Sequence, residues 1–458
     1  MVFSSSAFIL AFIPVTLILY FIIPARNVMG RNLILLAASL VFYGWGEPKY
    51  ILVMMISILA NYFAALNLSK HKSKLMLAFV VIINLGLLGY FKYTDFFIDT
   101  INKVSSLGLG NLGVVLPIGI SFYTFQALSY AIDVYRGKVD AQKNIVIVAT
   151  YITMFPQLIA GPIVRYSDVE EKLKSRDNTV DNIAIGIRRF VIGLSKKVLI
   201  ANQVALIWDD VYAQISAGYE VSLLSAWLGA IAFTLQIYYD FSGYSDMAIG
   251  LGKILGFNFL ENFNFPYISR SITEFWRRWH MSLSSWFKEY VYIPLGGNRK
   301  GLFRQIINIM IVWALTGLWH GASWNFVLWG IYYGVLLIIE KLFMLDFLEK
   351  HHAFGHVYTL ILVVFGWVIF NITDFDILGE YIKAMFNFSM LIDAGFKYNF
   401  LSYIGPILIG AFFSKPFANL DPNREVSALD AKYALGLLLV SICFIVGGTY
   451  NPFLYFRF

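Results

Sequence analysis

Long apolar runs alternate with short polar connections along most of this chain. The runs cover residues 7–23, 33–45, 51–68, 75–91, 114–132, 145–164, 198–215, 223–239, 305–319, 323–339, 357–372, 401–413 and 433–448. Apolar residues are continuous within each run instead of alternating with a period of two, which predicts helices and not the strands of a membrane barrel. Several runs are shorter than the about 20 residues that a straight span needs, so we expect other helices to cover some of them. The pattern predicts an all-α, polytopic integral membrane protein with about 11–13 transmembrane helices, plus re-entrant or cytoplasmic-surface helices.

The composition agrees with a membrane protein. Of the 458 residues, 59% are hydrophobic, 17% are aromatic and only 14% are charged, and the mean hydropathy is +0.68. A water-soluble protein of this length could not hide so much apolar surface, whereas a bilayer solvates it. We find no internal repeat and no linker, so we expect a single membrane domain that covers residues 1–458.

Lysine and arginine give the chain a formal charge of +7 and gather at every second polar connection. This placement is typical of cytoplasmic loops and argues against a nucleic-acid surface. The positive-inside rule then predicts that both termini lie outside the cytoplasm. Cys443 is the only cysteine, which excludes an intrachain disulfide and a metal site of the CxxC type. We predict no metal site.

The run 145–164 differs from the others because Pro156, Gly161 and Pro162 interrupt it. Basic residues flank the run on both sides, and both flanks are expected to be cytoplasmic. Our hypothesis is that this segment enters the membrane and returns to the same face.

His320 is an ionisable residue inside a segment built for lipid, between the apolar runs 306–319 and 323–339. A titratable side chain at membrane depth is costly, so it marks a functional site that lines a protected cavity or path. The alternative is a histidine that only hydrogen-bonds a neighbouring helix.

A second dense segment, residues 272–300, combines basic and aromatic residues with a glycine turn on a connection expected to be cytoplasmic. Its candidate binding residues for an anionic donor are Arg277, Arg278, Trp279, Arg299 and Lys300. Guanidinium and ammonium groups hold phosphates, and an indole stacks on a flat ring. The alternative is that the cations only set topology and the tryptophans lie at the membrane interface.

Together these segments resemble the membrane-bound O-acyltransferase family, and within it the bacterial alginate and peptidoglycan O-acetyltransferase membrane subunits. The matching stretches are residues 155–163, 239–248, 275–284, 292–299 and 318–321, which read FPQLIAGPI, YDFSGYSDMA, FWRRWHMSLS, YIPLGGNR and LWHG. The subunit that D-alanylates teichoic acids shares the tryptophan–histidine strip, but the turn at 293–299 places this chain closer to the sugar acetylators.

The resemblance implies a catalytic role for His320, with His280 as a second histidine of the site. A base must remove the proton of an attacking hydroxyl, and neutral imidazole is suited to this task. Asp240 and Asp246, at the expected end of the run 223–239, could orient a histidine or the donor, although hydrogen bonding at a helix end is the simpler interpretation. Trp324 and Asn325 follow His320 and are candidates for shaping its pocket.

The resemblance also implies acetyl transfer from cytoplasmic acetyl-CoA, as a substrate and not a bound cofactor, towards an extracytoplasmic polysaccharide. It further implies a bacterial cytoplasmic membrane and an extracytoplasmic partner protein that completes the transfer. The C-terminal residues 450–458 are similar to the tail of the small partner in teichoic-acid D-alanylation, whose tyrosine takes the acyl group. We therefore expect Tyr455 to act as a covalent relay, the alternative being an aromatic interface anchor. A secondary transporter or flippase, with His320 in a proton path, is the rival function from another class, and D-alanyl transfer to teichoic acid is a further alternative.

Overall fold

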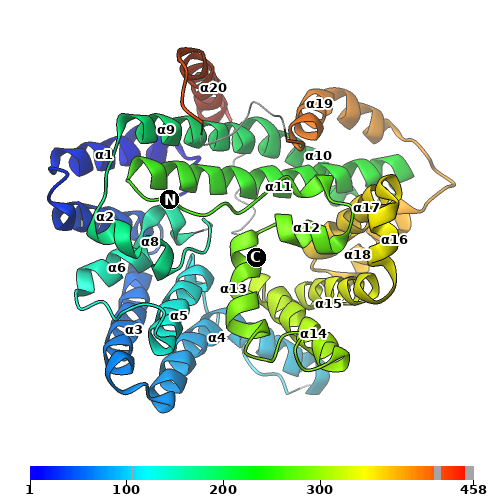
Figure 1. Ribbon diagram of the computed structural model, residues 1–458. Helices are drawn as coiled ribbons and strands as arrows, with labels where there is room; N and C mark the ends of the chain where they lie inside the picture. The colour runs from blue at the N-terminus through cyan, green and yellow to red at the C-terminus, as the bar shows by residue number, and fades with distance from the viewer. Residues whose placement is uncertain (106, 160, 417–423, 449–458) are drawn as a thin grey trace. The chain divides into compact units, whose positions relative to one another are not determined.

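The computed structural model describes residues 1–105, 107–159, 161–416 and 424–448 (Figure 1). About 77% of the chain is helical, and no strand occurs in these ranges. The prediction of an all-α protein is confirmed. The chain folds into two compact units. The prediction of a single domain is not tested by this division and stays a prediction.

The first unit holds residues 1–192, 244–260 and the described part of 423–436. Its helices are α1 (Ile13–Ile22), α2 (Val28–Gly44), α3 (Ile51–His71), α4 (Lys74–Ser105), α5 (Ile120–Arg136), α6 (Ile145–Thr153), α7 (Phe155–Leu158), α8 (Tyr166–Lys174) and most of α9 (Val180–Ser195). Short non-α turns at Phe8–Phe12 and Pro48–Tyr50 precede α1 and α3.

The second unit holds residues 193–243 and the described parts of 261–422 and 437–458. Its helices are α10 (Asn202–Ser216), the first two thirds of α11 (Leu223–Ile254), α12 (Ile272–Arg278), α13 (Met281–Phe287), α14 (Leu302–His320), α15 (Trp324–Ile339), α16 (Leu345–Lys350), α17 (His352–Asn371), α18 (Phe375–Met385), α19 (Ala394–Phe413) and the end of α20 (Ala428–Gly447). Turns of π-helix at Lys196–Ala201, Lys288–Tyr292 and Glu340–Met344 and a 3-10 turn at Pro266–Ile268 complete it.

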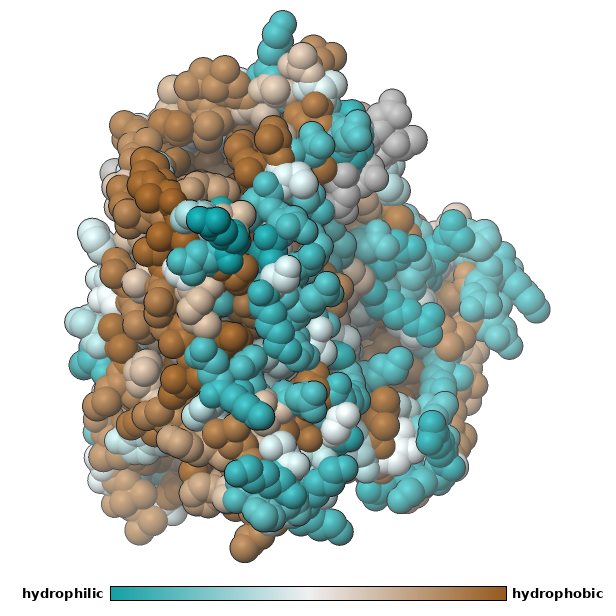
Figure 2. All heavy atoms as spheres, turned by 60° about the vertical axis from the view of Figure 1, so that its left-hand side comes forward, coloured by the Kyte–Doolittle hydropathy of each residue, from teal (hydrophilic) through white to brown (hydrophobic). Residues whose placement is uncertain are grey.

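Seven helical segments of the described chain are long and apolar enough to cross a membrane. They are Pro48–His71, Lys74–Ser105, Val180–Ser216, Leu302–His320, Trp324–Lys350, His352–Asn371 and Ala428–Gly447, and two shorter apolar helices, Phe8–Ile22 and Val28–Gly44, accompany them. Apolar side chains also cover broad areas of the surface visible in Figure 2. The protein is therefore a polytopic membrane protein, as predicted.

Fewer than the expected 11–13 helices meet this criterion, and α5 and α11 show why. Almost every side chain of the 17-residue α5 is buried, so protein and not lipid surrounds it. Helix α11 is 32 residues long but carries buried polar side chains such as Gln236 and Asp240, which lower its hydropathy.

The run 145–164 forms two short helices instead of one span. Helix α6 has nine residues, Met154 interrupts it, and α7 has four residues with Pro156 in its first turn. Nine helical residues extend about 14 Å, which is less than half of the hydrocarbon thickness. The broken helix is compatible with re-entry, and the position of its two flanks on one membrane face stays a prediction.

Candidate active site

His320 is the last residue of α14 and is buried, with only 7% of its surface exposed. Its imidazole lies between aromatic rings of two other helices. The ring centroid is 5.1 Å from that of Trp329 on α15 and 5.3 Å from that of Phe370 on α17. Three spanning helices therefore fix the position of this ring.

Glycines allow α14 and α15 to approach closely enough to bring these aromatic rings around His320. A Cβ atom on Gly317 would lie 2.2 Å from the carbonyl oxygen of Phe326, and one on Gly330 would lie 2.3 Å from that of Trp313. At Gly321, the residue after His320, a Cβ would collide with the Phe326 ring at 2.1 Å. The glycine of the Leu-Trp-His-Gly stretch thus gives room for the aromatic wall beside the histidine.

His280 is also buried and connects α12 to α13, outside the seven spanning helices. Its φ of +45° is unusual for a residue with a side chain. The ring packs edge-on against Phe241 of α11, with centroids 4.7 Å apart, and its Nδ1 lies 3.1 Å from Oδ1 of Asn262. Burial lowers the pKa of His280 to about 3, so the imidazole is neutral at physiological pH.

The structure brings the two predicted histidines together around one indole. The ring of Trp319 lies 5.9 Å from that of His280 and 5.0 Å from that of His320. Residues 40 positions apart thereby contribute to one aromatic-walled site in the second unit. Whether the two imidazoles act in catalysis is not tested by this geometry, and their catalytic role stays a prediction.

A buried carboxylate fixes the helix that leads to His280. Glu340, in the π-helical turn after α15, is fully buried and accepts hydrogen bonds from the backbone N–H groups of Ile272 and Thr273, at 2.6 and 2.8 Å. A negative charge at a helix N-terminus satisfies free N–H groups and complements the helix dipole. Glu340 therefore anchors α12 to the helix hairpin that carries His320.

The predicted donor-binding residues fall into two groups. Arg277, Arg299 and Lys300 are exposed, whereas Trp279 is buried, with its ring 4.7 Å from Trp367. Arg278 is half-buried and pairs with Glu274 at 2.9 Å. The exposed cations are accessible to an anion, and the indole of Trp279 is part of the core. The binding role of all five residues stays a prediction.

The turn that carries Arg299 and Lys300 depends on its two glycines. Gly296 and Gly297 have φ values of +108° and +57°, which are strained for other residues. The buried Asn308 of α14 donates a hydrogen bond to the carbonyl oxygen of Gly297, at 2.9 Å. The turn is thereby tied to the helix that ends at His320.

Asp240 and Asp246 do not lie at a helix end, because α11 continues to Ile254, and that expectation was wrong. Asp240 forms a buried ion pair with Lys197, and Asp246 pairs with Arg189 at 2.9 Å. The two carboxylates are compensated by cations, and this explains why they do not end the helix.

Asn325 caps the end of a neighbouring helix. Its Nδ2 donates to the carbonyl oxygen of Phe370, at 2.8 Å, and so positions the ring that packs against His320. Trp324, beside it, is exposed. Tyr455, the proposed relay, lies outside the described residues.

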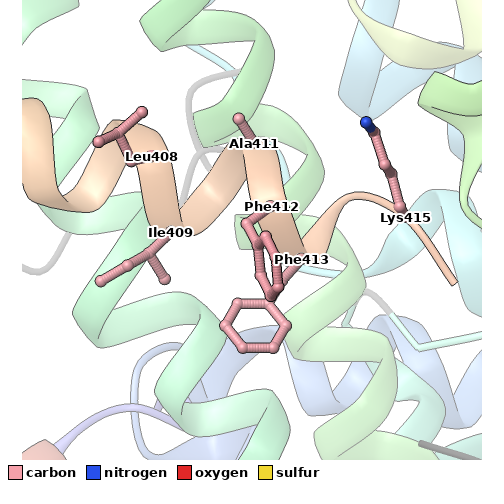
Figure 3. A pocket seen from close by; sticks show the side chains of 6 residues that line it. All are labelled: Leu408, Ile409, Ala411, Phe412, Phe413 and Lys415. Carbon is pink, nitrogen blue, oxygen red and sulfur yellow. The ribbon is translucent and has the colours of Figure 1, made fainter. Parts of the chain in front are cut away.

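An open apolar groove on α19 is separate from these residues. Among the described residues, Leu408, Ile409, Ala411, Phe412, Phe413 and Lys415 line it (Figure 3). Figure 3 shows the apolar side chains along the last turns of the helix, with Lys415 beyond its end. None of the predicted site residues within the described ranges is among these lining residues.

Sequence reasoning missed Asn262 and Glu340. Both are polar residues whose function depends on partners far away in sequence, 18 residues in one case and 68 in the other. An acidic residue directly after the apolar run of α15 was a detectable signal for Glu340, because a buried carboxylate requires compensation. Asn262 stands in a polar connection where no local pattern distinguishes it.

Comparisons with known proteins agree with the resemblance read from the motifs. A model of the MBOAT, membrane-bound O-acyltransferase family, matches residues 141–378, which include both histidines. The probable alginate O-acetylase AlgI of Azotobacter vinelandii is 38% identical over 100% of both chains. The peptidoglycan O-acetyltransferase of Helicobacter pylori is 32% identical over 100% of this chain and 98% of its own length.

A more distant relative shares only part of the chain. The teichoic acid D-alanyltransferase of Bacillus subtilis is 29% identical over 49% of this chain and 59% of its own length. The full-length similarity to the acetylating relatives and the match of the family model lead to one conclusion: this chain is an O-acyltransferase and belongs to the membrane-bound O-acyltransferase family.

Proposed function

We propose that this protein transfers an acetyl group from a cytoplasmic thioester, acetyl-CoA, towards an extracytoplasmic polysaccharide such as alginate or peptidoglycan. The observation that carries the proposal is similarity along the whole chain to proteins named alginate O-acetylase and peptidoglycan O-acetyltransferase. The shared site of His280 and His320 around Trp319 supports it, because acyl transfer to a hydroxyl needs a neutral base.

In this mechanism His320 acts as the base. The hydroxyl oxygen of the acceptor attacks the thioester carbonyl carbon while its proton passes to the imidazole of His320. The C–S bond then breaks, an ester forms, and the proton passes from the imidazolium to the thiolate. The rings of Trp329 and Phe370 keep the imidazole in place and exclude water, which would otherwise hydrolyse the thioester.

The exposed cations are proposed to hold the phosphates of the donor. Arg277, Arg299 and Lys300 lie on the connection around α12 and α13, which the charge pattern assigns to the cytoplasmic face. Arginine and lysine side chains bind phosphate through charge-assisted hydrogen bonds. This arrangement lets the phosphates of acetyl-CoA stay in water while its thioester enters the aromatic site.

Tyr455 is proposed as an intermediate acyl carrier. Its phenol would attack the thioester with His320 as base, forming an acetyl-tyrosine ester and free thiol. A partner protein outside the cytoplasm would then move the acetyl group to the polysaccharide. The proposal places the protein in a bacterial cytoplasmic membrane with both termini outside, as the distribution of basic connections supports.

Transfer of D-alanine is the second candidate, because a teichoic acid D-alanyltransferase matches part of the chain. Purified protein in detergent, given labelled acetyl-CoA or a labelled D-alanyl thioester, separates the two. We expect label transfer or thioester consumption with acetyl-CoA alone. Consumption of only the D-alanyl thioester would show that the protein transfers D-alanine instead of acetyl. Consumption of neither thioester would favour a transport function.

Mass spectrometry of protein trapped with acetyl-CoA tests the relay. We expect a mass increase of one acetyl group on the C-terminal peptide, lost in Tyr455→Phe together with transfer to the partner. Tyr433→Phe, at an exposed tyrosine of α20, is the matched control. A fully active Tyr455→Phe protein without acetylated peptide would end the relay.

A further inference from the structure

Asn262 contacts His280 at the centre of a buried hydrogen-bond cluster. Its Oδ1 lies 3.1 Å from Nδ1 of His280, 3.2 Å from the backbone nitrogen of Ser282 and 2.9 Å from Oγ of Ser282. Asn262, His280 and Ser282 expose 0%, 1% and 6% of their surfaces. Water therefore does not compete for these contacts.

The backbone of Ser282 determines which way the Asn262 amide points. A backbone N–H can only donate, so the atom that faces it must be the amide oxygen and not the amide nitrogen. The backbone carbonyl oxygen of Asn262 also accepts a hydrogen bond from the backbone N–H of Met281, at 2.9 Å. This bond holds the segment around Asn262 in register with the start of α13. A flipped amide would place its N–H₂ group against a donor.

The orientation of the amide in turn determines the protonation of the imidazole. Because Oδ1 of Asn262 accepts, Nδ1 of His280 must carry the hydrogen of this contact. In the neutral ring only one nitrogen is protonated, so Nε2 has a bare lone pair. Burial keeps the ring neutral by lowering the pKa of His280 to about 3.

Nε2 of His280 is buried and has no hydrogen-bond partner among the described residues, and the same holds for Nδ2 of Asn262. The rings that pack on this imidazole, Phe241 and Trp319, carry no charge. A buried acceptor without a partner is costly, and such groups occur where a ligand supplies the missing hydrogen.

We propose that Asn262 is a positioning residue that holds His280 with Nδ1 protonated, so that the bare Nε2 accepts a hydrogen bond from a polar hydrogen of a bound substrate without taking that proton. The proposal rests on the acyl-transfer function and gives the two histidines different roles. His320 takes the proton, and His280 orients the bound substrate. The hydrogen comes from an amide N–H of the acyl donor or from the hydroxyl of the acceptor. Both groups would donate the same kind of hydrogen bond to Nε2.

The simpler role for Asn262 is a cap on the N-terminus of α13, and Asn262→Asp distinguishes the two. Aspartate is an equally good cap acceptor, so the contacts with Ser282 are kept in either case. Its carboxylate, however, favours the imidazolium form, in which Nε2 becomes a donor. We expect the acidic limb of the pH–rate profile to gain a second protonation, that of His280, whose pKa rises by about 1–3 pH units. An unchanged profile overturns the proposal.

Asn264→Asp is the matched control, because Asn264 is exposed and lies two residues along the same segment. Its pH–rate profile should equal that of the wild type. Asn262→Leu then identifies the source of the hydrogen: a roughly tenfold rise in KM for acetyl-CoA assigns it to the donor, and the same rise for the acceptor assigns it to the hydroxyl. Unchanged KM values for both would contradict the proposal.

The tautomer is measurable without any activity assay. Full-length protein with ¹⁵N-labelled histidine, compared with a His280→Gln sample for assignment, should show His280 protonated at Nδ1 and bare at Nε2. A bare Nδ1 overturns the inference even if acetyl transfer is observed. The expected tautomer in a protein that transfers no acyl group would instead refute the proposed function and leave the tautomer in place.

Discussion

Two buried polar clusters of this protein, one in each unit, differ in whether their polar atoms all have hydrogen-bond partners within the protein. In the first unit Ser57, Asn61 and Asn84 hydrogen-bond one another across α3 and α4, with Asn61 and Asn84 exchanging bonds of 3.0 and 3.1 Å. In the second unit the cluster of Asn262, His280 and Ser282 leaves Nε2 of His280 and Nδ2 of Asn262 without partners among the described residues.

This difference separates a structural cluster from a functional one. Polar side chains that pair between spanning helices hold those helices together, and they need nothing else. In the proposed mechanism, the second cluster gains its missing hydrogen bond when a substrate binds. Substitutions in the first cluster should therefore change stability, whereas substitutions in the second should change catalysis.

The largest effect on stability is expected for a buried ion pair, in which each charge offsets the cost of burying the other. Lys197→Met removes the cation that faces Asp240 in the second unit and leaves a buried carboxylate. Breaking such a pair costs about 3–5 kcal/mol of folding free energy. Thermal unfolding in detergent checks this, and Lys350→Met, at an exposed lysine of the second unit, is the control. Equal melting temperatures for the two variants would contradict the importance of the pair.

Asn84→Leu sharpens the comparison from the structural side. The substitution leaves Asn61 and Ser57 without their partner inside the membrane and should cost about 1–2 kcal/mol. Because the cluster lies in the first unit and not at the two histidines, we expect acetyl transfer per folded molecule to stay within twofold of wild type. A large loss of turnover in stable protein would show that this cluster has a functional role.

A smaller effect concerns the dependence of stability on pH. The folded pKa of His280 lies below its unfolded value of about 6.5, so the unfolded chain binds the extra proton. Stability is therefore complete above pH 6.5 and falls as the pH decreases towards 3, by up to about 1.4 kcal/mol per pH unit. In His280→Gln, the melting temperature should depend less on pH between pH 6.5 and 4.5. The same slope in both proteins would show that the ring is not buried in its neutral form.

The smallest effect on the fold is expected for the exposed cations. Arg299→Ala should leave the melting temperature unchanged, because its side chain is in solvent, and should raise KM for acetyl-CoA several-fold at low salt. Arg26→Ala, at an exposed arginine of the first unit, is the control. Equal KM values for both variants would remove Arg299 from the donor site.

The hairpin around His320 could be predicted almost to the residue. The expected runs 305–319 and 323–339 correspond to Leu302–His320 and Trp324–Ile339, because long apolar runs on both sides of a glycine leave few alternatives. The same logic failed at α11, which was expected to end at Tyr239. Its carboxylates Asp240 and Asp246 suggested a helix end, and only their distant partners Lys197 and Arg189 explain why the helix continues.

The contacts that shape the site could not be read from the sequence for a related reason. Histidine in an apolar run is a local signal, and it identified His320. The hydrogen bond from Nδ1 of His280 to Oδ1 of Asn262 and the contact of Glu340 with the N-terminus of α12 join segments that only tertiary packing brings together. The role of a polar residue depends on the groups that it contacts in the folded protein, and the sequence alone does not reveal those contacts.

Acetyl transfer by purified His320→Ala protein tests the central claim most directly. At matched abundance and an unchanged melting temperature, we predict that the rate falls by about 10²–10⁴ relative to wild type, the usual contribution of a general base. His71→Ala, at an exposed histidine on the last turn of α3, should retain the full rate. A His320→Ala protein that transfers acetyl groups as fast as the wild type would contradict the account.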